Sequence, residues 1–244
     1  MVRKEYVLQR AFFQLIYPRR CPVCEKVLAP RDKFIHIDCR NELEFIQQPT
    51  CLRCGKPVDT KEQEYCFDCN QKVFHYIRGF PCIKYDKRMS KSISAFKYYG
   101  RKEYADFYVD ELLHRYKETF SRMKFDVLVP VPIHKSKRVI RGYNQAELIA
   151  EGIGEAIGVE VDVKLLLRNK KTLPQKELDE KERLKNLIQA FSINKSGSIK
   201  AYQRVLLVDD IYTSGATIEA CARILKEAGV KEVYYTSVCI GKGY

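Results

Sequence analysis

The stretch RVLLVDDIYTSGATIEAC, residues 204–221, decides the fold class of this 244-residue chain. It begins with the apolar run of a buried strand and ends in a helical pattern. Two adjacent carboxylates, Asp209 and Asp210, stand where the strand gives way to a turn of small and hydroxyl-bearing residues. Ligands of open α/β sheets bind at the carboxyl ends of the strands. The stretch therefore predicts an α/β domain with a ligand site at this edge.

The turn after the strand has the features of a phosphate site. Backbone N–H groups at the start of a helix, together with the positive end of the helix dipole, favour a bound anion. Gly215 lets the chain approach that anion closely. The carboxylates would then face vicinal hydroxyls or a hydrated Mg²⁺, and a ribose 5-phosphate fits this distribution. The predicted phosphate-binding residues are Thr213, Ser214, Gly215, Ala216 and Thr217.

Strand and helix patterns alternate on both sides of this stretch. Such alternation predicts a parallel sheet with helices on both faces. Asn144 is the expected N-cap of one helix, and Gly229 closes another. The expected strands lie at 80–85, 125–132, 165–169, 205–210 and 232–240, and the expected helices at 88–98, 103–120, 144–158 and 216–229.

Seven of the ten cysteines cluster between residues 21 and 69, and three C-x-x-C pairs are among them. In a reducing compartment such pairs bind metal more often than they form disulfides. Paired knuckles supply the four donors of tetrahedral zinc, and a site filled by protein ligands is structural. The expected ligand sets are Cys21, Cys24, His36 and Cys39, then Cys51, Cys54, Cys66 and Cys69.

The pattern defines the second set more firmly than the first. In the first set His36 stands where a fourth cysteine would complete the pattern, so it is either a ligand or a surface histidine beside a different site. One or two structural Zn²⁺ ions are therefore expected. The expected domains are 1–78, an N-terminal helix with a double zinc-ribbon module, and 79–244.

Composition bounds the class of partner. Apolar residues make up 45% of the chain, enough for a packed core. The formal net charge of +13 favours polyanions such as nucleic acid, phosphates or an acidic membrane face. No signal peptide precedes the cysteines, and no apolar run approaches the ~20 residues of a membrane span, so a cytoplasmic location is expected.

Two basic segments precede the phosphate turn. The first follows the strand at 125–132 and is either an anion-binding loop or a solvated basic loop; its basic residues are Lys135, Lys137, Arg138 and Arg141. The second, at 84–102, alternates basic residues with tyrosines, so that charges could follow a strand of DNA while rings stack on its bases. The alternative is a solvated helical face with buried tyrosines. The candidate DNA contacts are Lys97, Tyr98, Arg101 and Lys102.

The stretch at 204–221 resembles the 5-phosphoribosyl 1-pyrophosphate (PRPP) motif of type I phosphoribosyltransferases: an apolar strand, D-D, two residues, then T-S-G-x-T. Receiver and hydrolase folds also place paired aspartates at strand ends, as bare Mg²⁺ sites, but lack this turn. The order of blocks resembles the ComF family of late-competence proteins. These blocks are the cysteine ribbons, FKYYG, VPVP…RGYNQAELIA, R-x-x-x-T-x-x-Q-x-x-L…R-x-x-N and the PRPP motif, and they cover nearly the whole chain from Cys21 onward.

The resemblance implies an α/β fold with a type I phosphoribosyltransferase-like parallel sheet and flanking helices, preceded by the double zinc ribbon. It implies that Asp209 and Asp210 face the ribose hydroxyls of PRPP, which binds with Mg²⁺, and that the basic loop holds pyrophosphate. From its length, its Pro174 and its alternating charges, the segment 168–186 is a candidate lid that excludes water, or else an ordered surface hairpin and helix. The candidate lid residues are Arg168, Thr172, Gln175 and Arg183.

The family also implies DNA uptake during natural transformation. The chain would handle incoming single-stranded DNA with a DNA-translocating ATPase, which could recruit it to the inner face of the membrane. It would act as a PRPP-binding module, as an adaptor, or as an active phosphoribosyltransferase with an unknown acceptor and with Asp209 and Asp210 as catalytic residues. Thr213 stands where enzymes acting on hypoxanthine or guanine often place an acidic base, which argues against that substrate class alone.

Overall fold

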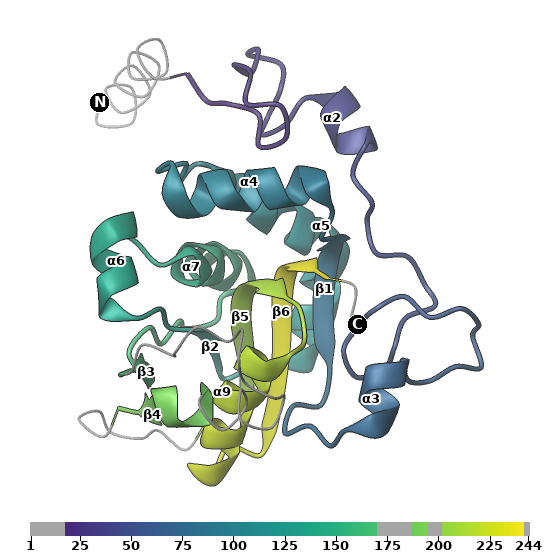
Figure 1. Cartoon of the computed structure of the whole chain (residues 1–244), viewed down its shortest axis with the longest axis vertical. Helices are drawn as coiled ribbons and strands as arrows, with labels where there is room; N and C mark the ends of the chain where they lie inside the picture. The colour runs from purple at the N-terminus through teal and green to yellow at the C-terminus, as the bar shows by residue number, and fades with distance from the viewer. Residues whose placement is uncertain (1–17, 170–186, 195–201, 242–244) are drawn as a thin grey trace, which may run out of the picture.

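The computed structural model describes residues 18–169, 187–194 and 202–241 (Figure 1). The predicted N-terminal helix lies outside them. An irregular cysteine-rich module comes first and contains two short helices, α2 (Ile37–Asn41) and α3 (Phe67–Gln71). The remaining elements are β1 (Gly79–Lys84), α4 (Lys87–Tyr98), α5 (Tyr104–Met123), β2 (Val127–Pro130), α6 (Lys135–Arg141), α7 (Gln145–Ile157), β3 (Leu166–Arg168), β4 (Phe191–Ile193), β5 (Arg204–Tyr212), α9 (Ala216–Glu227) and β6 (Glu232–Ile240).

The centre of the molecule is a four-stranded parallel sheet in the order β1-β6-β5-β2. Helices α5 and α7 pack on one face of the sheet and α9 packs on the other (Figure 1). A small antiparallel pair, β3 and β4, lies against α9. The predicted α/β class with a parallel sheet and helices on both faces is confirmed.

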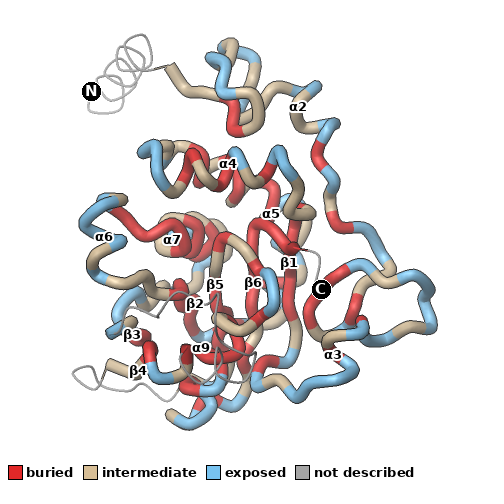
Figure 2. Tube along the Cα trace, in the orientation of Figure 1, coloured by how far each residue is buried: buried red, intermediate tan, exposed pale blue. Residues whose placement is uncertain are grey.

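Alternate residues of β5 pack into two different cores. Val205 and Leu207 belong to the cluster beneath α9, whereas Leu206 and Val208 belong to the cluster beneath α5 and α7. All four are completely buried, and the sheet forms the buried interior of Figure 2. A strand buried on both faces has a continuous apolar sequence. The same alternation carries the next two residues, both aspartates, to opposite faces of the sheet.

Local capping signals predicted several helix ends. The side chain of Asn144 accepts a hydrogen bond from the amide of Ala146 at 3.2 Å and caps α7, as expected. Gly229, with φ of +98°, follows α9. Among the described residues, no helix combines the length and the apolar character that a membrane span requires.

Two local expectations differ from the structure. The segment 135–141, expected as a loop, forms helix α6, because no breaker interrupts it between its cap His134 and Gly142. Strand β4 was not predicted; it is three residues long and pairs with β3, which was. The division of the chain at residue 78 stays a prediction, since the cysteines of residues 51–69 share an apolar cluster with the sheet and α9.

Candidate functional site

The twin carboxylates lie at the carboxyl end of β5 and point to opposite faces of the sheet. Asp210 is 6% exposed, and its Oδ2 lies 2.9 Å from Nζ of Lys97 in the last turn of α4. Asp209 lies on the α9 side, where Arg168 and Cys221 are its electrostatic neighbours. Its Oδ1 accepts a hydrogen bond from the amide of Asp210 at 2.8 Å. Strand β5 therefore places one carboxylate on each face of the sheet at its carboxyl end.

Burial, and then the negative charge of Asp210, raise the pKa of Asp209 to about 7, although Lys97 opposes this shift. A carboxyl group that titrates near neutrality in a cleft is a mark of functional sites. The carboxyl group of Asp209 is therefore ionised above that pH, or when a cation or hydrogen-bond donor stabilises its charged form. Their oxygen donors suit a hard cation such as Mg²⁺, so the chemistry of the pair fits the predicted ion.

Gly215 and Tyr212 shape the turn after β5. Gly215 has φ of +81°, and a Cβ at this position would lie 2.3 Å from Oη of Tyr212, so only glycine fits. Helix α9 then starts without a side-chain cap from any described residue, and its first amides have no partner within the helix. Thr213 and Ser214 are exposed beside these amides. The turn offers N–H and O–H donors to an anion.

A cavity of about 290 Å³ joins the carboxylates to Thr213 and Thr217 of the turn. Four basic side chains also line it: Lys97 from α4, Lys137 and Arg141 from α6, and Arg168 from β3. Burial, followed by repulsion from Arg168 and Arg141, lowers the pKa of Lys137. Four cations face two carboxylates here, so the cavity carries excess positive charge that a polyanionic ligand would neutralise.

Helix α6 explains which residues of the basic segment reach this cavity. Lys137 and Arg141 are four residues apart and share one helix face, which lines the cavity. Lys135 and Arg138 do not line it, and Nη1 of Arg138 instead lies 2.9 Å from Oε2 of Glu147. The segment expected as a basic loop is therefore a helix with one basic face toward the cavity, and the pyrophosphate contact of its four basic residues stays a prediction.

The predicted lid is described only at its first residue. Arg168 ends β3, lines the cavity and lies over the ring of Phe191 in β4 at 5.1 Å. The remaining candidates, Thr172, Gln175 and Arg183, lie outside the described residues. The lid stays a prediction.

Of the four candidate DNA contacts, only Lys97 lines the cavity, and the DNA role of the four stays a prediction. Lys97 points into the cavity, paired with Asp210, and therefore belongs to the carboxylate site. Tyr98 is 63% exposed and carries the guanidinium of Arg141 over its ring at 4.9 Å. Arg101 lies 3.8 Å from Glu103, and Lys102 lies over the ring of Tyr143 at 5.1 Å.

Sequence reasoning missed two residues of the site. Gln145 lines the cavity, and its Oε1 accepts a hydrogen bond from Nη1 of Arg141 at 2.9 Å, which fixes that guanidinium. The position of Gln145 directly after the N-cap Asn144 was the only sequence feature that could have indicated its place in the cavity. Tyr212 lies beyond the strand predicted at 205–210, although it stands between the carboxylates and the turn.

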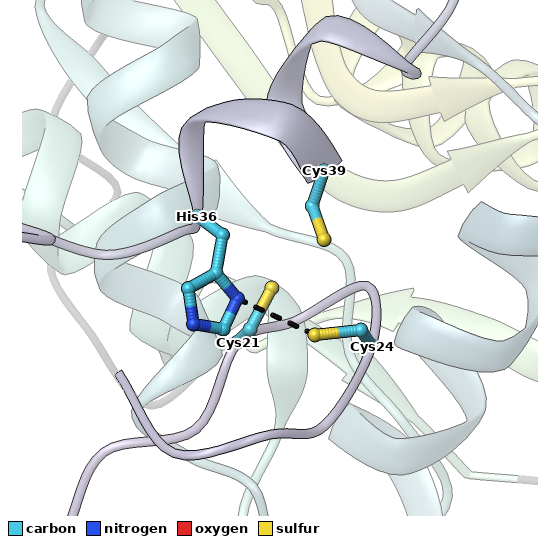
Figure 3. A group of neighbouring side chains, drawn as sticks. All are labelled: Cys21, Cys24, His36 and Cys39. Carbon is cyan, nitrogen blue, oxygen red and sulfur yellow. Dashed lines mark hydrogen bonds between the residues drawn. The ribbon is translucent and has the colours of Figure 1, made fainter. Parts of the chain in front are cut away.

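The first metal cluster is complete with His36. The donor atoms of its four members lie within 4.8 Å of one another (Figure 3). Nδ1 of His36 lies 3.3 Å from Sγ of Cys24, and the other ring nitrogen, Nε2, donates to the carbonyl of Val27 at 3.3 Å. A backbone acceptor on one nitrogen leaves the second as a metal ligand, as is usual for zinc-bound histidine. The arrangement favours a Cys₃His zinc site over a surface histidine.

The second cluster consists of four cysteines that are all buried. Sγ of Cys54 lies 3.6 Å from Sγ of Cys66, close to the ~3.8 Å edge of a ZnS₄ tetrahedron with Zn–S bonds of about 2.3 Å. Both clusters use the same turn after the first C-x-x-C: Glu25 and Gly55 have φ of +61° and +72°. The two ribbons, here called the first (residues 18–46) and the second (47–78), are thus built alike.

Comparison with known families divides the chain in the same way. The family described as "Double zinc ribbon domain" matches residues 12–70, and the family described as "Phosphoribosyl transferase domain" matches residues 146–242. The molecule is therefore a structural zinc module joined to a domain of the phosphoribosyltransferase type. In particular, the chain belongs to the ComF family. It is 32% identical over 208 residues to "Competence protein ComFC" of Streptococcus pneumoniae, a match that covers 83% of this chain and 86% of the relative.

Two further relatives match over most of their length. "Competence protein F" of Haemophilus influenzae is 28% identical over 219 residues, which cover 81% of this chain and 93% of that protein. "DNA utilization protein YhgH" of Escherichia coli is 26% identical over 229 residues, which cover 92% of this chain and 98% of the relative. Each of these matches therefore spans more than four-fifths of this chain and of the relative.

Proposed function

We propose that the chain binds PRPP with Mg²⁺ in the cavity at the end of β5 and acts in DNA uptake during natural transformation. PRPP carries a 5-phosphate, two vicinal hydroxyls and a pyrophosphate. One observation supports this ligand above all: a single cavity brings together a helix start, a carboxylate pair and a set of basic side chains. Each group of the ligand has a chemically matched partner there.

The proposed roles follow from this geometry. The amides at the start of α9 hold the 5-phosphate. Asp209 and Asp210 accept hydrogen bonds from the ribose hydroxyls, and Lys97 forms an ion pair with Asp210. Lys137 and Arg141 hold the pyrophosphate. Bound Mg²⁺ would neutralise part of the pyrophosphate charge, as it does for phosphate substrates in general.

The DNA role is supported by the relatives and by charge. Two matched relatives carry competence in their names and a third carries DNA utilization. A net charge of +13 suits a polyanionic partner. In this proposal the chain is cytoplasmic, handles incoming single-stranded DNA and works with a DNA-translocating ATPase.

An active phosphoribosyltransferase is the second candidate function. The near-neutral pKa of Asp209 favours it, because such a carboxyl can exchange protons at physiological pH. In that reaction an acceptor nucleophile attacks C1 of the ribose, and the bond from C1 to the pyrophosphate oxygen breaks. Release of pyrophosphate in the presence of an acceptor separates this function from binding alone.

Calorimetry with PRPP and Mg²⁺ tests the proposal. Wild type should bind, Asp209→Ala/Asp210→Ala should not, and Glu118→Ala/Glu155→Ala, which removes two exposed carboxylates elsewhere, should bind like wild type. Affinity should fall about tenfold between pH 8 and pH 6, because Asp209 becomes protonated through its pKa of about 7. No heat from the wild type, or unchanged binding by the aspartate variant, would refute PRPP binding at this site.

A further inference from the structure

A second cavity, of about 1000 Å³, lies at the other end of the sheet. The second ribbon forms one wall, the C-terminal half of α5 forms the other, and the start of β1 lies between them. Four basic residues and several aromatic residues line it, and no aspartate or glutamate does among the described residues. We call this cavity the basic groove, defined by Arg53, Arg78, Arg115 and Lys226 with Tyr65 and Tyr116.

The four basic residues of the groove form no ion pair with a described carboxylate. In the described part of the chain, no carboxylate lies within 4.0 Å of any of its four basic groups. The basic residues of the first cavity differ in this respect, because Lys97 there is paired with Asp210. Four converging cations without carboxylates form a binding surface for a polyanion.

Two of the guanidinium groups are held in place by neutral partners. Nη1 of Arg53 donates to the carbonyl oxygens of Phe74 and Tyr76, at 3.2 and 3.1 Å. Arg78 lies over the ring of Phe80 at 5.7 Å. Their positive charge is therefore fixed toward the groove without being cancelled, so little side-chain entropy would be lost on binding.

Aromatic rings stand among these charges. Tyr65 is 36% exposed on the second ribbon, and Phe74 and Tyr116 are partly exposed. Rings of this kind stack on the bases of a single strand, whose unpaired bases are accessible. A duplex would hide its bases from the rings, and an acidic peptide would satisfy only the charges. Rings and charges together favour single-stranded nucleic acid.

We propose that the basic groove is the path of single-stranded nucleic acid on this protein. The proposal rests on the DNA-handling part of the proposed function. It places the nucleic acid on a different surface from Tyr98, Arg101 and Lys102, the candidate contacts at and after the end of α4. The groove lies where β1 begins, whereas the PRPP cavity lies where β5 ends. A strand and PRPP are therefore bound at the same time, without direct competition.

Fluorescence anisotropy with a labelled 20-nucleotide thymidine strand tests this path on the full-length, zinc-loaded chain. Arg78→Ala/Arg115→Ala/Lys226→Ala should weaken binding at low salt by at least tenfold. It should reduce the slope of log affinity against log salt by about 2, since each phosphate contact on a single strand contributes about 0.7. Arg78→Ala alone removes a contact with the ring of Phe80 but no hydrogen bond given for the described residues, and should weaken binding several-fold. This single variant keeps the test valid if the triple variant fails to fold.

The matched control is Lys91→Ala/Arg101→Ala/Lys102→Ala, which removes the same charge from α4 and the segment after it and should leave affinity within about twofold. Saturating PRPP with Mg²⁺ should not displace the strand, and an abasic strand should bind at least fivefold more weakly. Equal binding of the abasic strand or of polyglutamate would overturn a nucleic-acid groove. Loss confined to the control variant would overturn the path but leave DNA handling intact, whereas no binding by the wild type would refute DNA handling itself.

Discussion

The two zinc ribbons share one local design but are attached to different sides of the sheet domain. The first ribbon contacts α5 through ion pairs, chiefly Arg40 with Glu111 and Arg19 with Asp106, and its Leu43 packs in the apolar cluster beneath α5 and α7. The second ribbon is continuous with the apolar core: its four cysteines are buried among residues of the sheet and α9. The backbone carbonyl of Cys54 accepts a hydrogen bond from the hydroxyl of Tyr235 at 2.7 Å. The same zinc module thus packs beside α5 in one place, with ion pairs and an apolar contact, and shares the apolar core of the sheet and α9 in the other.

The second ribbon also reaches the proposed PRPP site. The hydroxyl of Tyr76, at its end, lies 2.8 Å from the hydroxyl of Tyr212, whose ring stacks on Tyr235 at 4.8 Å. The neighbouring His75 hydrogen-bonds to the carboxylate of Glu219 in the first turn of α9. The ribbon therefore supports both sides of the turn that we propose binds phosphate. The first ribbon has no such contact among the described residues.

Loss of either zinc gives the largest expected contrast. Cys66→Ser/Cys69→Ser should abolish cooperative unfolding of the sheet domain and PRPP binding, because structural zinc contributes on the order of 10 kcal/mol and a domain has about as much in total. Cys24→Ser/Cys39→Ser removes the first ion and should leave a folded, PRPP-binding protein. Metal analysis measures the bound zinc, calorimetry measures cooperative unfolding, and titration with PRPP measures its binding. Equal loss of PRPP binding in both variants would contradict the distinction between the ribbons.

Gly215→Ala tests the turn that the second ribbon supports. Left-handed backbone and a Cβ at 2.3 Å from Oη of Tyr212 should together cost about 3 kcal/mol of unfolding free energy. PRPP affinity should fall at least a hundredfold, because the displaced tyrosine distorts the amides. Gly158→Ala is the matched control: its φ is +70°, but nothing lies within 4 Å, so it should cost only about 1 kcal/mol. Urea unfolding of both variants measures these costs. Similar losses of unfolding free energy in the two variants would show that the side chain of Tyr212 moves away from the new Cβ at little cost.

Arg40→Ala tests the attachment of the first ribbon. The side chain of Glu111 is only 5% exposed, so removal of Arg40 leaves a buried carboxylate without its partner. About 2 kcal/mol of unfolding free energy should be lost, less than for a fully buried pair because Arg40 is itself one-third exposed. Arg19→Ala, whose partner Asp106 is 46% exposed, should cost less than about 1 kcal/mol. PRPP affinity should not change in either variant, and a loss in Arg40→Ala would show that the first ribbon also reaches the site.

Local sequence signals predicted the sheet, the capped helix α7 and both metal clusters. Each depends on residues close together in the chain, such as the apolar run before Asp209 or the C-x-x-C spacing. The choice between Lys137 and Lys135 required α6 itself, because two prolines and a run of charges favoured a loop. The basic groove could not be predicted, since Arg53, Arg78 and Arg115 come from separate segments that only the tertiary fold brings together. The difference between the two ribbons could not be predicted either, because their contacts join segments that are far apart in the sequence.

The smallest predicted effect addresses the link between the second ribbon and the turn most directly. Tyr76→Phe and Tyr212→Phe each remove one hydroxyl of a buried pair, and each should cost about 1 kcal/mol because the remaining hydroxyl loses its partner. The double variant should cost less than the sum, since no hydroxyl is then left unsatisfied, and urea unfolding of all four proteins closes the cycle. PRPP affinity should fall a few-fold in each single variant. Tyr104→Phe, which removes a 3.3 Å hydrogen bond to the carbonyl of Cys21 in the first ribbon, is the control and should leave PRPP affinity unchanged. Additive stability costs with unaltered PRPP binding would show that the second ribbon stabilises the core without supporting the site.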